Sequence, residues 1–362
     1  MSQEEQTTES VKTGKRPKIV YCGYSLSNIA AKVRTGDFSS QILYGALELE
    51  QKGAEVSFYS QAGSLKGALQ DIRQLHRMRA DFLFFPYLKG TFYLLLALAK
   101  RMGYLRHERL AGILHFTPTI TSSNRWYIRW VYKVFDKVYF HSPRNMEECI
   151  QRGVVRQDQA ELLHWGTQLS YIDRIVAEQE EPTADEDFFI STGLENRDYD
   201  TLIEGFERSG QRLEIYAYTG CGLQERDTEH VKIHLIPRQN STQTFTALRT
   251  LKAKAVVIPI NAKGLAYCTG HTSIVEALAL GKPIIVTDNP YHPIDVEKVG
   301  VGLKVNPNDP QAWAEAVDSF SASEERSSEF ARNARRLAET TYNIDKCADQ
   351  IAAYMTHTFG EW

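Results

Sequence analysis

The segment from Gly270 to Asp288 combines residue types that can hold a phosphate group and a sugar diol. It reads as a loop ending in glycine, a short helix starting near Thr272 and Ser273, a stop at Gly281, and a buried strand. Backbone N–H groups in the first turn of a helix lack partners within the helix, and the helix dipole adds partial positive charge there. We therefore predict an anion site at this helix start.

A carboxylate stands one helical turn further along. Glu276 follows Thr272 by four residues, so its side chain is expected to face the same pocket. It would repel a phosphate but can accept two hydrogen bonds from a vicinal diol such as that of a ribose. The two features together suggest a site for a nucleotide diphosphate. The alternative is an ordinary amphipathic helix, capped by Thr272 and ended by Gly281, with Glu276 in solvent.

The same segment resembles the donor-binding motif of GT-B glycosyltransferases, especially those of the retaining family 4. In that motif the second Glu of a Glu-seven-residues-Glu pattern holds the nucleotide ribose, and the helix start holds the diphosphate. Glu276 matches the second Glu, whereas Cys268 stands where the first belongs. Thr269, His271 or backbone amides could replace the sugar contact of the first Glu. The resemblance implies five donor-binding residues: Gly270, His271, Thr272, Ser273 and Glu276.

Composition bounds the class of protein. The chain has 362 residues, 43% hydrophobic and 24% charged, which is ordinary for a globular protein and long enough for two domains. Its five cysteines stand singly, which argues against a disulfide framework or a zinc site and favours the cytoplasm. We expect no metal cofactor.

Strand-like runs alternate with helical stretches along the chain, which is the pattern of parallel sheets covered by helices. Strands are predicted in the first half within residues 17–24, 54–60, 80–86, 110–116, 137–142 and 160–166. In the second half they are predicted within residues 187–193, 212–218, 231–237, 253–260, 282–288 and 302–305. The main helices are predicted near residues 39–51, 199–209, 243–250, 272–280, 310–320, 325–341 and 344–358.

This organisation predicts an α/β protein of GT-B architecture, with two Rossmann-like, doubly wound parallel-sheet domains facing each other across a cleft. Residues 1–17 are predicted to be a disordered tail and 18–170 an acceptor-binding domain. Residues 171–187 are the predicted linker and 188–343 the predicted nucleotide-sugar-binding domain. The helix in 344–362 is expected to cross back to the first domain.

The loop after the predicted strand 187–193 has one cation, Arg197. A guanidinium can bind a phosphate through two hydrogen bonds, so Arg197 is predicted to hold and stabilise the leaving diphosphate. Pairing with neighbouring surface acids is the alternative. The segment resembles the family's strand-loop-helix that supplies an Arg and a Lys to the diphosphate, although Leu194 stands at the usual Arg position. Lys263 and Thr192 are further predicted phosphate contacts.

Two features of the first half resemble the family's acceptor side. His115 follows a predicted strand and matches the His placed near the transferred sugar, so we predict contact with a sugar hydroxyl. A structural role at a strand end is the alternative. Gly36 and Asp37 resemble the glycine loop that approaches the sugar and phosphate across the cleft, and an ordinary turn is the alternative. The resemblance implies that the leaving diphosphate itself takes the acceptor's proton.

Charge is divided unevenly along the chain. Residues 1–165 carry a net charge of +8 and residues 166–362 a net charge of −11, so the first half is expected to meet an anionic partner. Residues 123–137 interleave aromatic and basic side chains, which is typical of helices that rest on an anionic membrane surface. The alternative is a buried aromatic helix with solvated charges.

The sequence therefore predicts a cytoplasmic, hexosyltransferase-like glycosyltransferase, with peripheral contact at the inner face of a membrane. It is expected to move a sugar from a nucleotide-diphosphate sugar to a glycan or lipid-linked acceptor, with retention and without metal, in polysaccharide biosynthesis. A non-catalytic GT-B partner subunit and a nucleotide-sugar epimerase of this fold are the alternatives. Nucleic-acid binding is not expected, because the basic residues form no known motif.

Overall fold

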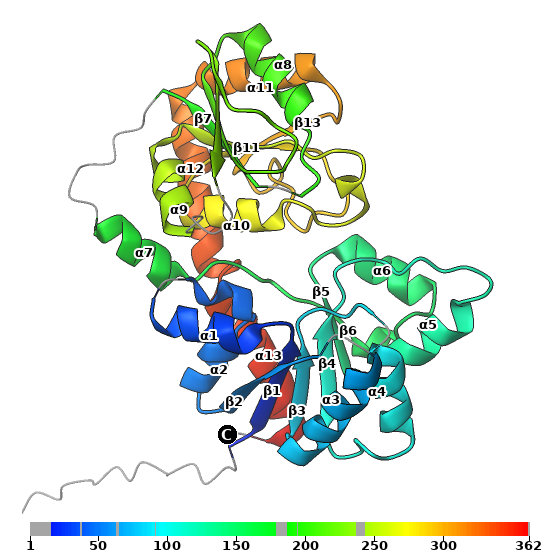
Figure 1. The fold of residues 1–362 in the computed structure, drawn as a ribbon. Helices are drawn as coiled ribbons and strands as arrows, with labels where there is room; N and C mark the ends of the chain where they lie inside the picture. The colour runs from blue at the N-terminus through cyan, green and yellow to red at the C-terminus, as the bar shows by residue number, and fades with distance from the viewer. Residues whose placement is uncertain are drawn as a thin grey trace, which may run out of the picture.

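The computed structural model describes residues 16–36, 38–62, 65–90, 92–178, 187–193, 195–236 and 243–360. These residues form two α/β domains, one above the other in Figure 1, each built on one sheet. Of the N-terminal tail predicted at residues 1–17, residues 1–15 lie outside the described part of the chain. Within the described residues, no helix is long and apolar enough to cross a membrane.

The first sheet has six strands in the order β2-β1-β3-β4-β5-β6, and all its pairings are parallel. The register places Tyr21 of β1 beside Phe58 of β2 on one side and Phe84 of β3 on the other. Each strand lies inside a predicted range, or begins one residue before it. The bounds are β1 Lys18–Gly23, β2 Glu55–Ser60, β3 Phe82–Phe85, β4 Arg109–Ile113, β5 Lys137–Phe140 and β6 Ala160–Leu162.

The second sheet has seven strands in the order β13-β12-β11-β7-β8-β10-β9. All are parallel except β9, Arg226–Asp227, a strand of 2 residues that pairs antiparallel with β10 and that the sequence pattern did not predict. The bounds of the others are β7 Phe189–Thr192, β8 Leu213–Tyr218, β10 Val231–Ile236, β11 Ala255–Ile258, β12 Ile284–Thr287 and β13 Gly302–Val305. The predicted fold of two Rossmann-like parallel-sheet domains is thus confirmed.

Helices cover the sheets, and their caps agree with local sequence. Ser142 and Asp309 each accept a hydrogen bond from a backbone N–H three residues on, and proline follows each of them at the first helical position. In the first domain the α-helices are α1 Leu26–Arg34, α2 Ala46–Gln51, α3 Leu65–Met78, α4 Phe92–Arg101, α5 Arg125–Tyr132, α6 Pro143–Gln151 and α7 Leu169–Ala177. The others are α8 Tyr199–Ser209, α9 Gln243–Lys252, α10 His271–Ala279, α11 Pro310–Ser321, α12 Glu324–Thr340 and α13 Ile344–Phe359.

The helix predicted over residues 39–51 is broken, which corrects the sequence interpretation. A 3₁₀ helix, Ser40–Leu43, precedes α2, and between them Tyr44 and Gly45 have left-handed φ angles of 50° and 82°. Helix α13 packs against this break so closely that a Cβ on Gly45 would lie 3.2 Å from Ala348 Cα. The break directs Tyr44 towards the space between the domains.

The core of each domain lies between its sheet and the covering helices. Strands β3 and β11 consist of buried apolar residues throughout, and β12 does so up to its last residue, the buried Thr287, as expected of parallel strands that are covered on both faces. These unbroken apolar runs made the strands readable from the sequence. The carboxyl ends of both sheets are directed to the interdomain space, which positions the loops that follow the strands.

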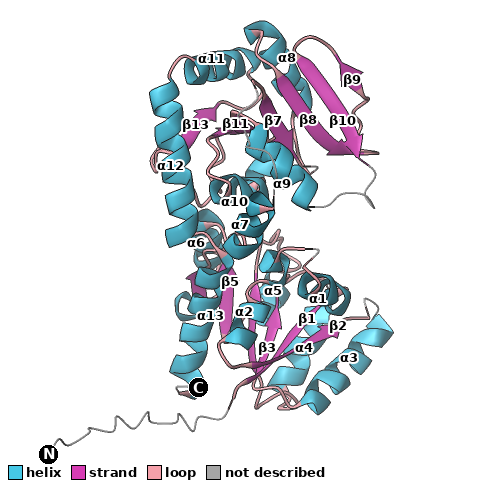
Figure 2. Cartoon of the chain, turned by 90° about the vertical axis from the view of Figure 1, so that its left-hand side faces the viewer, coloured by secondary structure: helices cyan, strands magenta, loops and turns pink. Residues whose placement is uncertain are grey.

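The chain passes between the domains twice. Of the predicted linker 171–187, residues up to 177 lie in α7 and 179–186 fall outside the described residues. At the second passage the Ile344 N–H donates to the Thr167 carbonyl at 3.1 Å, and α13 then runs along the first domain. Figure 2 shows α12 beside the second domain and α13 beside the first.

Candidate functional site

A pocket of about 700 Å³ lies between the two domains at the carboxyl ends of their strands. Its first-domain wall comes from the segments after β3, β4, β5 and β6. Its second-domain wall comes from the ends of β7, β8 and β10, from α9, and from the loop and first turns of α10. His115 lines it, and so do seven of the eight predicted donor-binding residues: Thr192, Arg197, Gly270, His271, Thr272, Ser273 and Glu276.

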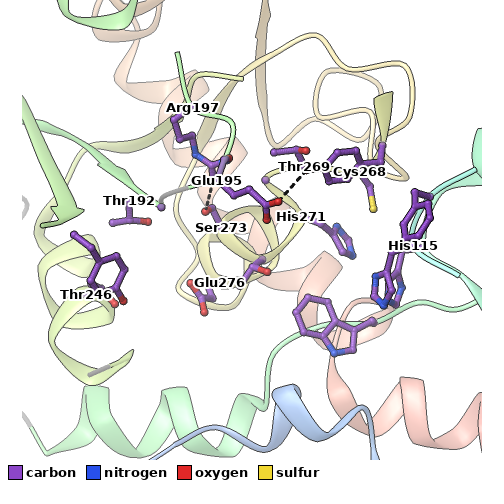
Figure 3. A pocket seen from close by; sticks show the side chains of 18 of the residues that line it. His115, Thr192, Glu195, Arg197, Thr246, Cys268, Thr269, His271, Ser273 and Glu276 are labelled. Carbon is purple, nitrogen blue, oxygen red and sulfur yellow. Dashed lines mark hydrogen bonds between the residues drawn. The ribbon is translucent and has the colours of Figure 1, made fainter. Parts of the chain in front are cut away.

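Arg197 comes from the loop between β7 and α8, and its guanidinium reaches the start of α10 (Figure 3). Nη2 donates to Ser273 Oγ at 3.1 Å, and Nη1 donates to the backbone carbonyl of Glu195 at 3.0 Å. Nε is buried and has no partner among the described residues. Burial lowers the pKa of Arg197. No ion pair between Arg197 and an acid is present in the described residues, so the predicted alternative of surface pairing is not observed.

Gly193 makes room for this arginine. Its φ angle is +119°, and a Cβ there would lie 2.6 Å from Arg197 Nη2. A glycine is therefore needed both for the backbone conformation and for the passage of the guanidinium towards Ser273.

Helix α10 begins at His271 after Gly270, whose φ is 87°, and no side chain caps it. The His271 N–H donates to the Cys268 carbonyl at 3.3 Å, and the Ile274 N–H to that of Gly270 at 3.0 Å. The backbone N–H groups of Thr272 and Ser273, which lie between these two, form no hydrogen bond within the described part of the chain. These amides and the Arg197 guanidinium together form a positive site suited to an anion.

Glu276 lies half-buried in this pocket and not in bulk solvent. The side-chain amide of Gln41, from the first domain, donates to Glu276 Oε1 at 3.0 Å. Burial raises the pKa of Glu276 to about 7, and the hydrogen bond from Gln41 opposes this rise. A second, smaller pocket of about 20 Å³ adjoins the same carboxylate. The carboxylate therefore borders both pockets.

Two histidines from neighbouring strands meet on the first-domain wall. His115 follows β4, and its Nε2–H donates to the Pro86 carbonyl at 2.8 Å. His141 follows β5, its Nδ1–H donates to the Leu163 carbonyl at 3.2 Å, and the two rings are 5.2 Å apart between centroids. Burial lowers the pKa of His115 and lowers that of His141 to about 3, so both are neutral. Sequence reasoning missed His141, although it ends its strand as His115 does.

The sequence also missed the aromatic lining. Tyr44, Tyr87 and Trp165 line the first-domain wall, and the Trp165 ring is 5.6 Å from that of His271 across the domain boundary. The signal that could have found Trp165 is its place after a predicted strand. No local signal indicates Tyr44, because it reaches the pocket only through the break in the predicted helix.

Two predicted residues lie away from the pocket. Lys263 is exposed and does not line it. Gly36 has a φ of 84°, and its carbonyl accepts a hydrogen bond from Arg174 Nη2 of α7 at 2.9 Å. Gly36 therefore adopts the left-handed conformation of a turn that packs against α7. Asp37 and Leu194 lie outside the described residues.

The residue in place of the missing Glu lines the pocket as well. Cys268 is half-buried there, and burial raises the pKa of its thiol to about 12, so the thiol is neutral. In the described ranges, no group of three or more His, Cys, Asp and Glu side chains is placed to hold a metal ion.

Comparisons with known proteins agree with the fold and with the second-domain motif. Residues 227–337 match the family described as Glycosyl transferases group 1, a range that contains α10 and the loop before it. No curated protein matches the chain.

Solved structures resemble the whole chain at low identity. A glycosyltransferase from Rickettsia africae ESF-5 has a TM-score of 0.70 at 12% identity, covering 94% of this chain and 98% of that one. Anabaena Alr3699/HepE in complex with UDP has a TM-score of 0.64 at 16% identity, covering 94% and 100%. WaaG, a glycosyltransferase involved in lipopolysaccharide biosynthesis, has a TM-score of 0.53 at 13% identity, covering 93% and 99%. The group 1 match and the GT-B fold of the chain together support its assignment as a glycosyltransferase.

Proposed function

We propose that this protein transfers a sugar from a nucleotide-diphosphate sugar to a glycan or lipid-linked acceptor, with retention and without a metal ion. One observation carries the proposal. In a single pocket, the free amides at the start of α10 and the Arg197 guanidinium lie one helical turn from the Glu276 carboxylate. The first two suit a diphosphate, and the third suits the diol of a ribose.

The nucleotide to test first is UDP. HepE, which has this fold, was solved in complex with UDP, and WaaG is a glycosyltransferase involved in lipopolysaccharide biosynthesis. These two proteins support a uridine nucleotide as donor and a lipid-linked glycan as acceptor.

The proposed step is a same-face substitution at the anomeric carbon. The bond from that carbon to the diphosphate oxygen breaks, the acceptor oxygen bonds to the carbon, and the acceptor's proton passes to the diphosphate. Arg197 and the α10 amides stabilise the charge that grows on the diphosphate, at about 1.5–3 kcal/mol for each charge-assisted hydrogen bond. His115 has its Nε2–H bound to the Pro86 carbonyl, so Nδ1 is free to accept a hydrogen bond from a sugar hydroxyl.

Glu276 is predicted to control nucleotide affinity. Replacing Glu276 with Ala should weaken UDP binding at least about tenfold, since a loss of 1.4 kcal/mol is a factor of ten. Because burial raises the pKa of Glu276 to about 7, the free protein must lose a proton to bind the diol below this pH. Wild-type affinity should therefore rise as the pH rises through 7. Titration calorimetry at several pH values measures both effects.

Glu276→Gln is the matched control for the pH dependence, because it keeps the side-chain shape and cannot titrate. Any pH dependence that it retains belongs to UDP itself. Equal UDP affinity for the wild type and Glu276→Ala would contradict the proposed role of Glu276 in nucleotide binding. Release of UDP from a UDP-sugar without acceptor would exclude a non-catalytic partner subunit.

The basic half of the chain carries an apolar surface that fits an anionic membrane. Leu94 and Leu98 on α4 and Met102, directly after it, are exposed, and Trp126 on the neighbouring α5 is 69% exposed. Exposed cations flank them at 101, 125 and 133. By contrast, Trp130 is partly covered by the Arg101 guanidinium, 4.9 Å from its ring centre. We propose that this surface rests on anionic lipid and so reaches a lipid-linked acceptor.

Liposome flotation tests this surface. The wild type should float with vesicles that contain phosphatidylglycerol and should not float with phosphatidylcholine alone, because both the charges and the exposed apolar side chains are needed. A Trp126→Ser/Met102→Ser variant should lose at least half of the bound fraction, whereas Val299→Ser, which changes an exposed apolar residue of the second domain, should lose none. Flotation that does not depend on lipid charge would contradict the assignment.

A further inference from the structure

We propose that Glu195 binds hydroxyl groups of the donor's sugar and so helps to determine which sugar the protein accepts. The inference rests on the proposed function, because it concerns the same pocket. Among the described residues that line the pocket, the acids are Glu195 and Glu276. Glu276 is one turn into α10 and is bound to Gln41, so it serves a different part of a ligand.

The Glu195 carboxylate is held by side chains from two loops. Tyr267, from the loop before α10, donates its hydroxyl hydrogen to Glu195 Oε1 at 3.2 Å. The Asn196 side-chain amide in turn donates to the Tyr267 hydroxyl oxygen. Asn196 has a left-handed φ of 53°, and its carbonyl accepts from the Asn261 N–H at 3.0 Å. The chain of hydrogen bonds fixes the direction in which the Glu195 carboxylate points.

The same loop presents an anion and a cation to the pocket without pairing them. The Arg197 guanidinium donates to the backbone carbonyl of Glu195, and in the described residues no ion pair joins the two side chains. Figure 3 shows Arg197 directed to Ser273, whereas the Glu195 carboxylate points into the pocket on the side of Thr269 and Cys268. A ligand that matches this arrangement has a phosphate at Arg197 and hydroxyl groups beside it.

Glu195 supplies the carboxylate on the side of the pocket formed by Thr269, Cys268 and His271. The Cys268 thiol is neutral, and burial holds the pKa of His271 well below its usual value. An ionised carboxylate has about four lone-pair sites, and Tyr267 occupies one of them. Glu195 is exposed to the pocket, so the remaining sites are open to a ligand. It would repel a phosphate, which leaves a sugar hydroxyl as its partner.

The test separates the sugar from the nucleotide. Titration calorimetry gives the Kd of UDP and of whichever of UDP-glucose, UDP-galactose, UDP-N-acetylglucosamine and UDP-glucuronate binds tightest to the wild type. In Glu195→Ala, the Kd of UDP should stay within about twofold, and the Kd of the UDP-sugar should rise at least about tenfold. Glu204→Gln, on the exposed face of α8, is the matched control and should change neither.

Tyr267 is a positioning residue, and its variant tests the arrangement. Tyr267→Phe should raise the Kd of the UDP-sugar several-fold and leave that of UDP unchanged. Because it acts through Glu195, the double variant with Glu195→Ala should bind the UDP-sugar no more weakly than Glu195→Ala alone. Additive losses would overturn this arrangement.

Three results would overturn the inference. These are an unchanged Kd for the UDP-sugar in Glu195→Ala, an equal loss for UDP and UDP-sugar, and a wild type that binds UDP but none of the UDP-sugars. The failure of the proposed function is distinct, since the wild type would then bind neither UDP nor GDP.

Discussion

Replacing Arg197 with Gln should lower kcat/KM for the nucleotide-sugar donor by about 10²–10³-fold, because a preorganised donor to a developing negative charge is removed. The guanidinium is held in place before the ligand arrives, by Ser273 Oγ and by the Glu195 carbonyl. Within the described ranges, no ion pair between Arg197 and an acid would have to be broken. The loss should appear mainly in kcat, because the diphosphate gains its extra charge only as the glycosidic bond breaks.

Steady-state release of UDP from the donor measures this effect. Arg197→Lys should recover only part of the activity, because an ammonium cannot bridge Ser273 and the carbonyl as a planar guanidinium does. Arg208→Gln, which removes an exposed arginine on α8, should behave as wild type. An Arg197→Gln enzyme with more than a tenth of wild-type kcat/KM would exclude Arg197 from the diphosphate site.

The second large effect concerns stability. Gly166→Ala should lower the free energy of unfolding by about 3 kcal/mol, at the upper end of the usual cost of overpacking. A Cβ on Gly166 would lie 1.9 Å from the Tyr342 carbonyl oxygen and 2.6 Å from the Asn343 nitrogen. All of these are backbone atoms, so no side-chain rotation relieves the contact. The chain at Tyr342–Asn343 must move, with the loss of its contact to Thr167.

Urea unfolding followed by circular dichroism measures the change. Gly53→Ala is the comparator: a Cβ there meets nothing within 4 Å, but the φ of +109° makes the substitution strained. Gly53→Ala should lower the free energy of unfolding by only about 1–2 kcal/mol. Equal stabilities for Gly166→Ala and the wild type would mean that the close approach of the two segments is wrong.

The sequence predicted the sheets well, and it predicted several residues that line the second-domain wall of the pocket. Strands such as β3 and β11 are buried on both faces, so they appear as continuous apolar runs. Arg197 and Ser273 are 76 residues apart, yet both follow strands of one parallel sheet. Because such strands share a carboxyl edge, the two loops had to meet.

The rest of the site depends on long-range contacts that local patterns do not contain. The backbone break that turns Tyr44 into the pocket is packed by Ala348, from the far end of the chain. The direction of the Glu195 carboxylate depends on Tyr267, whose loop lies in another part of the sequence. Gly36 and Lys263 were predicted to be in the site but lie away from the pocket. A glycine in a turn, or a cation after a strand, does not by itself show in which direction the following loop runs.

The segment that leads from the first domain into α7 touches the second passage of the chain between the domains, at Thr167 and Asn343. We expect this contact to act as a pivot between the domains. Separation of the domains about this point would keep the two segments paired, whereas rotation of one domain over the other would break the pairing. We therefore expect the two walls of the pocket to separate about this point and to return to the same alignment after each turnover.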